Sequence, residues 1–143
     1  LMKNIEQFLN DDLLIIHADN YTKFNLEHLI TAHNKRPKYC LMTILTFSTN
    51  APKECGIVEL DNNDVLVDFF EKSALEKGNR ANAAVYILSS TLLDELKNKN
   101  LEVTDIARDL IPMFKNRIYT YHTDDIFIDI GTIENYQRAN NSV

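Results

Sequence analysis

Glycine is scarce in this 143-residue chain, which has three glycines, Gly56, Gly78 and Gly131, all far apart. Their share is roughly 2%, against an average near 7%. Phosphate-cradling loops and dinucleotide-binding turns both need closely spaced glycines. The chain therefore contains no Gly-rich loop of either kind. A phosphate site here would have to be built from other groups, or be completed by residues outside this chain.

Cysteine is equally sparse, because Cys40 and Cys55 are the only two and neither belongs to a CxxC pair or a Cys/His run. This spacing argues against a zinc site and against a disulfide framework. Cys40 falls in an apolar run, where a thiol packs as a small hydrophobic group. Two free thiols fit a reducing compartment, so we expect a cytoplasmic protein.

Positive charge is also in short supply, since the formal net charge is -6. Nucleic-acid binders normally carry a basic patch or stripe, so no nucleic-acid partner is expected. No apolar run approaches the ~20 residues of a membrane span, so no membrane partner is expected either. The composition is that of an ordinary folded domain, and we expect residues 1–143 to form a single one.

The apolar pattern alternates between strands and helices. Residues 13–16 form a short apolar run that predicts a strand buried on both faces. Further strands are predicted at 40–47, 56–60, 65–70, 83–88, 118–121 and 126–130, and helices at 1–9, after Asn25, after Ser89, at 105–111 before Pro112, and after Thr132. His28 and His33 are predicted on a helix surface. The order predicts an α/β fold with a mixed, mostly parallel sheet flanked by helices.

Two acids follow predicted strands, Asp19 after residues 13–18 and Asp129 after residues 126–128. In open α/β sheets, ligands bind beyond the carboxyl ends of the strands. Carboxylates there can bind a hard cation such as Mg²⁺, which prefers oxygen ligands. The alternative is an acid that stabilises a turn or caps a helix. Asp129 stands in an apolar strand, and it needs a partner, a cation or solvent, since burying an unpaired carboxylate is costly.

Other polar residues near strand ends are candidates for ligand binding. Lys72 follows Glu71 at the end of the 65–70 strand and could meet a phosphate as a point charge. The alternative is an exposed ion pair worth about 0–1 kcal/mol. Asn82 precedes two alanines, a setting that suits a sugar hydroxyl but equally a turn.

Two segments in the first half of the chain resemble motifs of one enzyme family. Residues 14–20, Leu-Ile-Ile-His-Ala-Asp-Asn, resemble that family's apolar strand ending in an Asn-Gly-Asp-type turn, with His-Ala for Asn-Gly. Residues 55–61, Cys-Gly-Ile-Val-Glu-Leu-Asp, resemble its Tyr-Gly-Val-Val segment, with Cys for Tyr.

Three later segments extend the resemblance. Residues 70–73, Phe-Glu-Lys-Ser, resemble a Glu-Lys-Pro motif, and residues 81–86, Ala-Asn-Ala-Ala-Val-Tyr, resemble an Asn-Ala-Gly-Ile-Tyr strand with Ala84 at or near the Gly. Residues 129–136 resemble an Asp-Ile-Gly-Thr-Pro-Glu segment, with Ile for Pro. The motifs occur in the family's order, over residues 13–139. The family that these five segments resemble is that of the sugar-phosphate nucleotidyltransferases. The resemblance implies a partial nucleotide-diphospho-sugar transferase fold, which is Rossmann-like.

The resemblance also implies a reaction and a set of roles. A sugar 1-phosphate oxygen attacks the α-phosphorus of a nucleoside triphosphate, and pyrophosphate leaves, so no residue of the chain has to act as a nucleophile. Asp19 and Asp129 would hold the Mg²⁺ that bridges the two phosphates. The remaining roles are sugar and phosphate contacts: Glu71 to sugar hydroxyls, Lys72 to the sugar phosphate, Gly56 and Asn82 along the sugar pocket, and Thr132 near the metal.

One departure from the family pattern is large. The family's Gly-x-Gly-Thr-Arg-Leu loop, which holds the triphosphate, is not present in these residues, and neither is its downstream Pro-Lys. We therefore expect the chain to be the C-terminal portion of a nucleotidyltransferase domain and to lack turnover by itself. Mannose, glucose and heptose 1-phosphates are all compatible with the resemblance as acceptors, and overall resemblance slightly favours guanylyl transfer to mannose 1-phosphate.

Other functions stay open at this point. The chain could be a non-catalytic domain that binds a sugar phosphate or a partner chain. A partial sheet would expose apolar strand edges, which favour association, including a homo-oligomer. A metal-dependent glycosyltransferase of related fold is a weaker alternative, because His17-Ala18-Asp19 offers one acid where a pair is needed.

Overall fold

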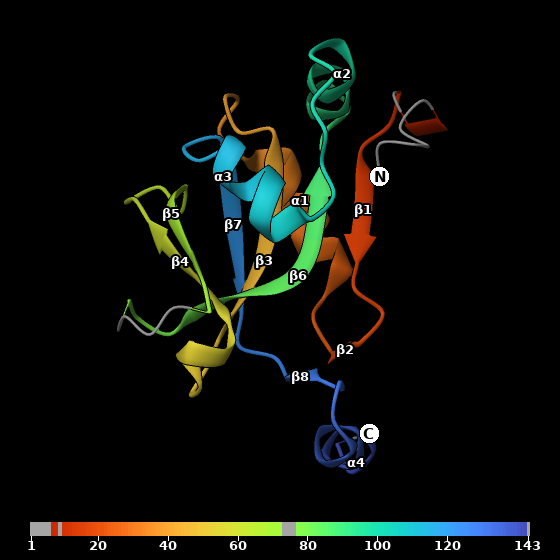
Figure 1. The fold of residues 1–143 in the computed structure, drawn as a ribbon, viewed down its shortest axis with the longest axis vertical. Coiled ribbons are helices and arrows are strands. Elements are labelled where there is room, and N and C mark those ends of the chain that lie inside the picture. Colours follow the sequence, from red (N-terminus) through yellow and green to blue (C-terminus); the bar gives the residue numbers. More distant parts are fainter. Residues whose placement is uncertain (1–6, 9, 73–76, 143) are drawn as a thin grey trace.

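The computed structural model describes residues 7, 8, 10–72 and 77–142 (Figure 1). The predicted α/β class is confirmed, while the predicted opening helix at 1–9 lies largely outside the described residues. The elements are β1 (Leu13–Ile16), β2 (Asn20–Thr22), α1 (Leu26–Lys35), β3 (Met42–Ser48), the 3-10 helix η2 (Pro52–Glu54), β4 (Gly56–Leu60), β5 (Leu66–Glu71), β6 (Arg80–Leu88), α2 (Ser90–Asn98), the π-helical turn η3 (Ile106–Leu110), α3 (Ile111–Met113), β7 (Ile118–Thr123), β8 (Phe127–Asp129) and α4 (Ile133–Asn140).

The main sheet has the strand order β5-β4-β6-β3-β7, and β1 pairs with the end of β6. The sheet is mixed, as predicted, but the prediction that parallel pairs dominate is wrong. Only β3 and β7 pair in parallel, and every other pair in the described residues is antiparallel. For β4 and β5 the connection explains this, because parallel neighbours need a crossover of a dozen or more residues, and residues 61–65 are too short for one.

Helices cover both faces of this sheet (Figure 1). On one face, Leu29 of α1 packs with Leu45 of β3 and Val85 of β6 in one buried cluster. On the other face, α2, η3 and α3 pack over a second cluster that includes Leu96 and Ile44. A separate two-stranded sheet, β2 with β8, leads into α4. The sheet is therefore the central layer, and its polar strand ends are left for other contacts.

The three predicted helix starts are confirmed by side-chain caps. Asn25 accepts a hydrogen bond from the backbone N–H of His28, Ser89 from that of Leu92, and Thr132 from that of Asn135. Such caps satisfy backbone donors that have no partner within the first turn. The caps could be read from the sequence because each lies within three residues of the group it bonds.

Three local predictions are corrected. Strand β1 is half-buried on one face and exposed on the other, where Leu14 and Ile16 are 38% and 47% exposed. His33, predicted on a helix surface, is 2% exposed, because α1 turns it against the sheet. Pro112 does not stop the preceding helix but lies in the first turn of α3, where its missing N–H costs no helical hydrogen bond.

The structure also shows the surroundings of the two cysteines. Cys40 is buried, as predicted for a small apolar group, and burial raises its pKa to about 11. Cys55 is half-buried, and burial raises its pKa as well. Both thiols are free. Within the described residues, no helix is long and apolar enough to cross a bilayer.

Candidate functional site

A cavity of about 270 Å³ opens where the 17–20 loop, the β4–β5 hairpin, β6 and β8 meet. Six of the seven residues predicted to bind ligand line it: Asp19, Gly56, Glu71, Lys72, Asn82 and Asp129. The seventh, Thr132, is not among the lining residues and serves as the N-cap of α4. The remaining lining residues are His17, Asn20, Phe47, Glu54, Cys55, Ala84, Tyr86, Asp105, Ala107 and Phe127.

The two predicted metal ligands lie at a pair of hydrogen-bonded strands, Asp19 directly before β2 and Asp129 at the end of β8. Strand β2 pairs with β8 so that Asn20, the residue after Asp19, stands opposite Asp129. The carbonyl of Asp19 accepts a hydrogen bond of 2.8 Å from the backbone N–H of Ile130. One carboxylate oxygen of Asp129 accepts a 2.8 Å bond from Gly131 N–H. Chain segments more than 100 residues apart therefore bring both exposed carboxylates to one wall of the cavity.

The β4–β5 hairpin supplies the opposite wall. Gly56 and Glu71 are register partners. A Cβ on Gly56 would lie 2.5 Å from the Phe69 ring and 2.8 Å from a carboxylate oxygen of Glu71. The glycine is therefore required by close approach, not by a positive φ. Lys72 comes next with a φ of 45°, a left-handed turn that ends the strand.

The floor of the cavity contains an irregularity in β6. Three residues of β6 face the single Leu45 of β3, and the middle one, Ala84, has a φ of 52°. Asn82 holds this bulge, because its side-chain oxygen accepts from Ala84 N–H at 3.0 Å and its amide donates to the Tyr86 hydroxyl at 2.9 Å. Bulges of this kind bend a strand and redirect its side chains. Asn82 thus lines the cavity and also fixes its shape.

The bulge in turn anchors the 17–20 loop. The carbonyl of Ala84 accepts from His17 N–H at 3.2 Å, and the side-chain amide of Asn20 points to the carbonyl of Ala83 at 3.4 Å. The His17 ring also meets the ring of Tyr86 edge to face, with centroids 6.0 Å apart. The position of Asp19 therefore depends on the irregular backbone of β6.

The charge of the cavity is strongly unbalanced. Among the described residues, its lining holds five carboxylates, from Asp19, Glu54, Glu71, Asp105 and Asp129, against the single ammonium of Lys72. Among ion pairs between described residues, none involves Asp19, Glu71, Lys72 or Asp129. Unpaired carboxylates are suited to bind a cation or sugar hydroxyls.

The donor set is compatible with Mg²⁺. Mg²⁺ is usually held by one or two carboxylates, with water and substrate phosphate completing its shell. Asp19 and Asp129 are exposed oxygen donors and fit this pattern. Within the described residues, no group of three or more His, Cys, Asp or Glu side chains could enclose a metal. The arrangement fits an ion shared with a ligand, not a closed structural site.

Several cavity residues were missed by sequence reasoning. Phe127 of β8 stacks on Phe47 of β3 with ring centroids 4.0 Å apart, and Asp105 caps η3 at the rim. Strand β2 was also missed, because three residues carry too little pattern to identify. Tyr86 is the lining residue that the sequence could have identified, because it ends the segment that resembles an Asn-Ala-Gly-Ile-Tyr strand.

Comparison with known protein families assigns the chain to a class of protein. A family model described as nucleotidyl transferase matches residues 2–143. The chain belongs to this family, which confirms the resemblance seen in the sequence.

Individual relatives narrow the comparison. The chain is 27% identical over 143 residues to a glucose-1-phosphate adenylyltransferase of Geobacillus stearothermophilus, covering 95% of this chain and 37% of that protein. It is 26% identical to the enzyme of the same name from Lachnospira eligens, covering 97% and 34%. The chain thus spans little more than a third of the length of these curated relatives.

A solved structure supports the fold. The crystal structure of a Bacillus anthracis protein assigned as a glucose-1-phosphate thymidylyltransferase, in complex with sucrose, superposes with a TM-score of 0.80. The match covers 98% of this chain and 57% of that chain, at 18% identity. At this identity the likeness establishes the fold alone.

Proposed function

We propose that this chain forms the sugar-phosphate and metal-binding part of a sugar-phosphate nucleotidyltransferase. The whole protein would transfer a nucleotidyl group from a nucleoside triphosphate to a sugar 1-phosphate and release pyrophosphate. The observation that carries the proposal is the cavity, which gathers Asp19, Asp129, Glu71, Lys72 and Asn82 from four separate segments. Alignment of two substrates and neutralisation of phosphate charge are what this transfer needs most.

In this proposal, each wall of the cavity has a role. The ammonium of Lys72 would meet the sugar phosphate, and the carboxylate of Glu71 would accept hydrogen bonds from sugar hydroxyls. Gly56 would leave room for the sugar, since a Cβ there would collide with the Glu71 side chain. Asn82 already uses both ends of its amide inside the fold, so its main contribution would be to shape the sugar pocket.

Asp19 and Asp129 would hold the Mg²⁺. When bound, such an ion orients two phosphates and offsets negative charge as it develops. The ion would also offset the charge of the cavity. The five carboxylates and one lysine of the described lining would repel an anionic substrate that entered without a cation. Binding of a sugar 1-phosphate should therefore depend more strongly on Mg²⁺ than binding of an uncharged sugar.

The sugar and the base remain to be assigned by experiment. The slight sequence preference for guanylyl transfer to mannose 1-phosphate is still only a prediction. The curated relatives reported above are named for glucose 1-phosphate, which makes that sugar phosphate the first to test. A cytoplasmic location and a homo-oligomer likewise stay proposals.

A non-catalytic role is the second candidate. Leu14 and Ile16 on the outer face of β1 are exposed apolar side chains, and β6 is the only described strand that pairs with β1. A sugar-phosphate-binding or interaction domain would need the same cavity but no triphosphate site.

Turnover separates the two candidates. The whole protein that contains this chain is assayed for pyrophosphate release with Mg²⁺, glucose or mannose 1-phosphate, and ATP, dTTP or GTP. We expect activity with one pair, lost in Asp19→Asn and Asp129→Asn and kept in Asp94→Asn, which changes an exposed acid of α2 outside the cavity.

Two results would count against the proposal. Binding of a sugar phosphate without turnover for any pair would favour the non-catalytic role. Wild-type activity in both cavity variants would show that the metal assignment is wrong.

A further inference from the structure

The β4–β5 hairpin connects the cavity to a distant polar cluster. One end of the hairpin carries Gly56, Glu71 and Lys72, and the other end is the turn at residues 61–65. Among the described residues, β4 is paired with β6 at one position, Ile57 with Ala81. This pair fixes the hairpin at its cavity end, and separate contacts hold the turn, among them a bridge between Val65 and Tyr119 of β7.

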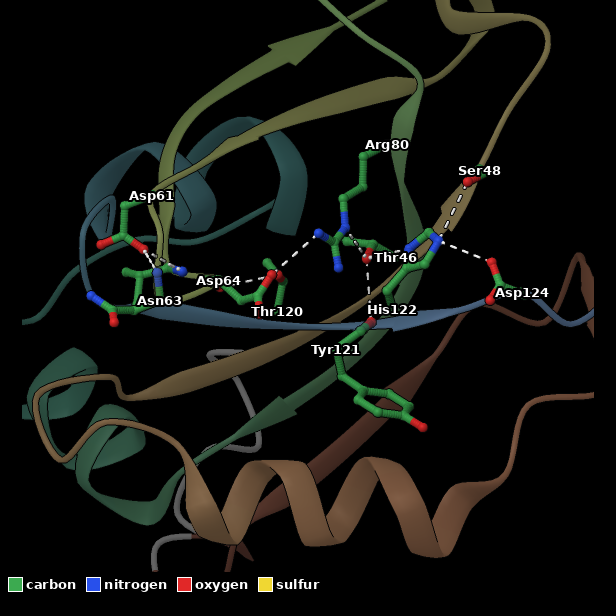
Figure 2. A network of polar contacts seen from close by, with 11 residues as sticks. Thr46, Ser48, Asp61, Asn63, Asp64, Arg80, Thr120, Tyr121, His122 and Asp124 are labelled. Carbon is green, nitrogen blue, oxygen red and sulfur yellow. Dashed lines mark hydrogen bonds and ion pairs between the residues drawn. The ribbon is translucent and has the colours of Figure 1, made fainter.

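Arg80 makes such a contact from the first position of β6. Its Nη1 donates to a carboxylate oxygen of Asp64 in the turn at 3.2 Å, and its Nε donates to the Thr46 hydroxyl on β3 at 3.1 Å (Figure 2). Thr46 in turn donates to the carbonyl of Tyr121 on β7 at 3.3 Å, and its hydroxyl lies 3.2 Å from Nδ1 of His122. The guanidinium thus links the hairpin turn to two neighbouring strands.

Other bonds hold the same turn, but to β7 instead of β6. The carbonyl of Asp64 accepts from the backbone N–H of Thr120 at 2.9 Å and from its hydroxyl at 3.0 Å. Lys115 forms an ion pair with Asp68. These contacts keep the hairpin attached when Arg80 is changed. What Arg80 adds is the position of the turn relative to β6, the strand that carries Asn82.

The geometry points to Arg80 as a positioning residue for the proposed sugar-phosphate cavity. Arg80 and Asn82 flank Ala81, the residue that pairs with the base of the hairpin. By holding Asp64 at one end, Arg80 fixes the angle at which Glu71 and Lys72 face Asn82 at the other. The inference rests on the proposed function for the identity of the ligand, but not for the arrangement of these residues.

Arginine is suited to this task in a way that lysine is not. Its planar guanidinium presents donors in fixed directions, and here two of them point to acceptors on different elements. A lysine would offer a single point of charge on a flexible stem, so it could meet Asp64 or Thr46 but not hold both in one geometry. The conservative variant should therefore restore only part of the effect.

The test is a titration of the 143-residue chain with glucose 1-phosphate in Mg²⁺, followed through backbone amide signals. Arg80→Ala should weaken binding about three- to tenfold and shift the Glu71, Lys72 and Asn82 signals before ligand is added. Arg80→Lys should recover less than half of the loss. Asp64→Asn, which tolerates the φ of 58° at this position, should reproduce most of the Arg80→Ala loss, and the double variant should add little, because both changes weaken the Arg80–Asp64 contact.

Glu95→Gln is the matched control. It weakens the Arg117–Glu95 pair, which joins α2 to the residue before β7 and whose residues do not line the cavity. The control should lower stability while leaving affinity within about twofold. Equal losses of affinity in Glu95→Gln and Arg80→Ala would contradict the inference, because they would show that Arg80 contributes only to general stability. Unchanged affinity in folded Arg80→Ala would overturn the inference.

Failure of the proposed function gives a different pattern. If wild type binds neither glucose 1-phosphate nor mannose 1-phosphate, the ligand assignment falls. The ligand-free spectra still decide the inference. Shifted Glu71 and Lys72 signals in Arg80→Ala would support positioning by Arg80, and unshifted signals would contradict it.

Discussion

The two ends of the sheet differ in their polar side chains, which are buried and hydrogen-bonded at one end and exposed at the other. At the α1 end, His33 is buried and bonded on both ring nitrogens, to the Thr43 hydroxyl at 2.8 Å and to a carboxylate oxygen of Asp12 at 3.2 Å. The second oxygen of Asp12 accepts from Ser90 N–H at the start of α2. At the cavity end, Asp19 and Asp129 are exposed and no ion pair between described residues reaches them.

This difference predicts which substitutions change stability and which change ligand binding. Buried polar groups stabilise a fold when every donor and acceptor is satisfied, as around His33. Groups that bind a ligand need free donors and acceptors, so they contribute little to the free energy of folding. Changes at the α1 end should therefore lower stability and leave binding intact, while most changes at the cavity end should do the reverse.

The largest expected effect is at the α1 end. His33→Ala should lower the free energy of unfolding by about 3–4 kcal/mol, because it leaves a cavity and an unpaired Thr43 hydroxyl. Denaturant unfolding measures the loss, with His28→Ala on the exposed side of α1 as control, expected within about 0.5 kcal/mol. Similar losses in the two variants would remove the distinction between a buried cluster and a helix surface.

The second effect is a dependence of stability on pH. Burial, aided by the nearby Arg36 charge, lowers the pKa of His33 to about 4 from an ordinary value of 6.5. The unfolded chain therefore takes up a proton that the folded chain resists, so stability is full above pH 6.5 and is lost as pH falls toward 4. The expected loss is about 3 kcal/mol.

His33→Gln isolates this contribution, since glutamine does not titrate. The difference in unfolding free energy between wild type and variant should shrink between pH 6.5 and pH 4. His122, whose pKa is lowered mainly by burial, acts in the same direction and is present in both proteins. A difference that stays constant across this range would contradict a buried, neutral His33.

Gly56→Ala is a cavity-end change that should also affect folding. The new methyl group would lie 2.5 Å from the Phe69 ring, and displacing that ring should cost about 1–3 kcal/mol. Because the same methyl group would meet Glu71, binding of glucose 1-phosphate should weaken too. A variant with wild-type stability and affinity would show that the hairpin adapts without cost.

Ala84→Gly should have the smallest effect. The φ of 52° at Ala84 is strained for a residue with a side chain, and glycine would relieve it. Glycine also makes the unfolded chain more flexible, so the net change in unfolding free energy should stay within about 1 kcal/mol. Thermal unfolding measures it. A loss well above this value would mean that the methyl group of Ala84 is needed for packing.

Features set by nearby residues could be predicted from the sequence. The caps at Asn25, Ser89 and Thr132 depend on residues within one turn, and the β4–β5 hairpin depends on the turn residues at 61–64. The cavity residues were found through motifs whose order is retained. The structure brings six of the seven to one cavity, although their chemical roles stay predictions.

Features set by distant contacts could not be predicted. The burial of His33 depends on Thr43 and Asp12, which belong to other elements. The left-handed φ of Ala84 follows from the mismatch between β3 and β6, which has no signature in residues 81–86 alone. Thr132 caps α4, as predicted, and is not among the described lining residues, so its expected place near the metal stays a prediction.

The central claim is that the cavity binds a sugar phosphate through Lys72 together with Mg²⁺. The most direct test is a calorimetric titration of the chain with glucose 1-phosphate, with and without Mg²⁺, in wild type, Lys72→Ala and the control Lys38→Ala, an exposed lysine beyond α1. The account predicts Mg²⁺-dependent binding that Lys72→Ala weakens about tenfold or more and Lys38→Ala leaves unchanged. Binding that needs no Mg²⁺, or that Lys72→Ala leaves intact, would contradict it.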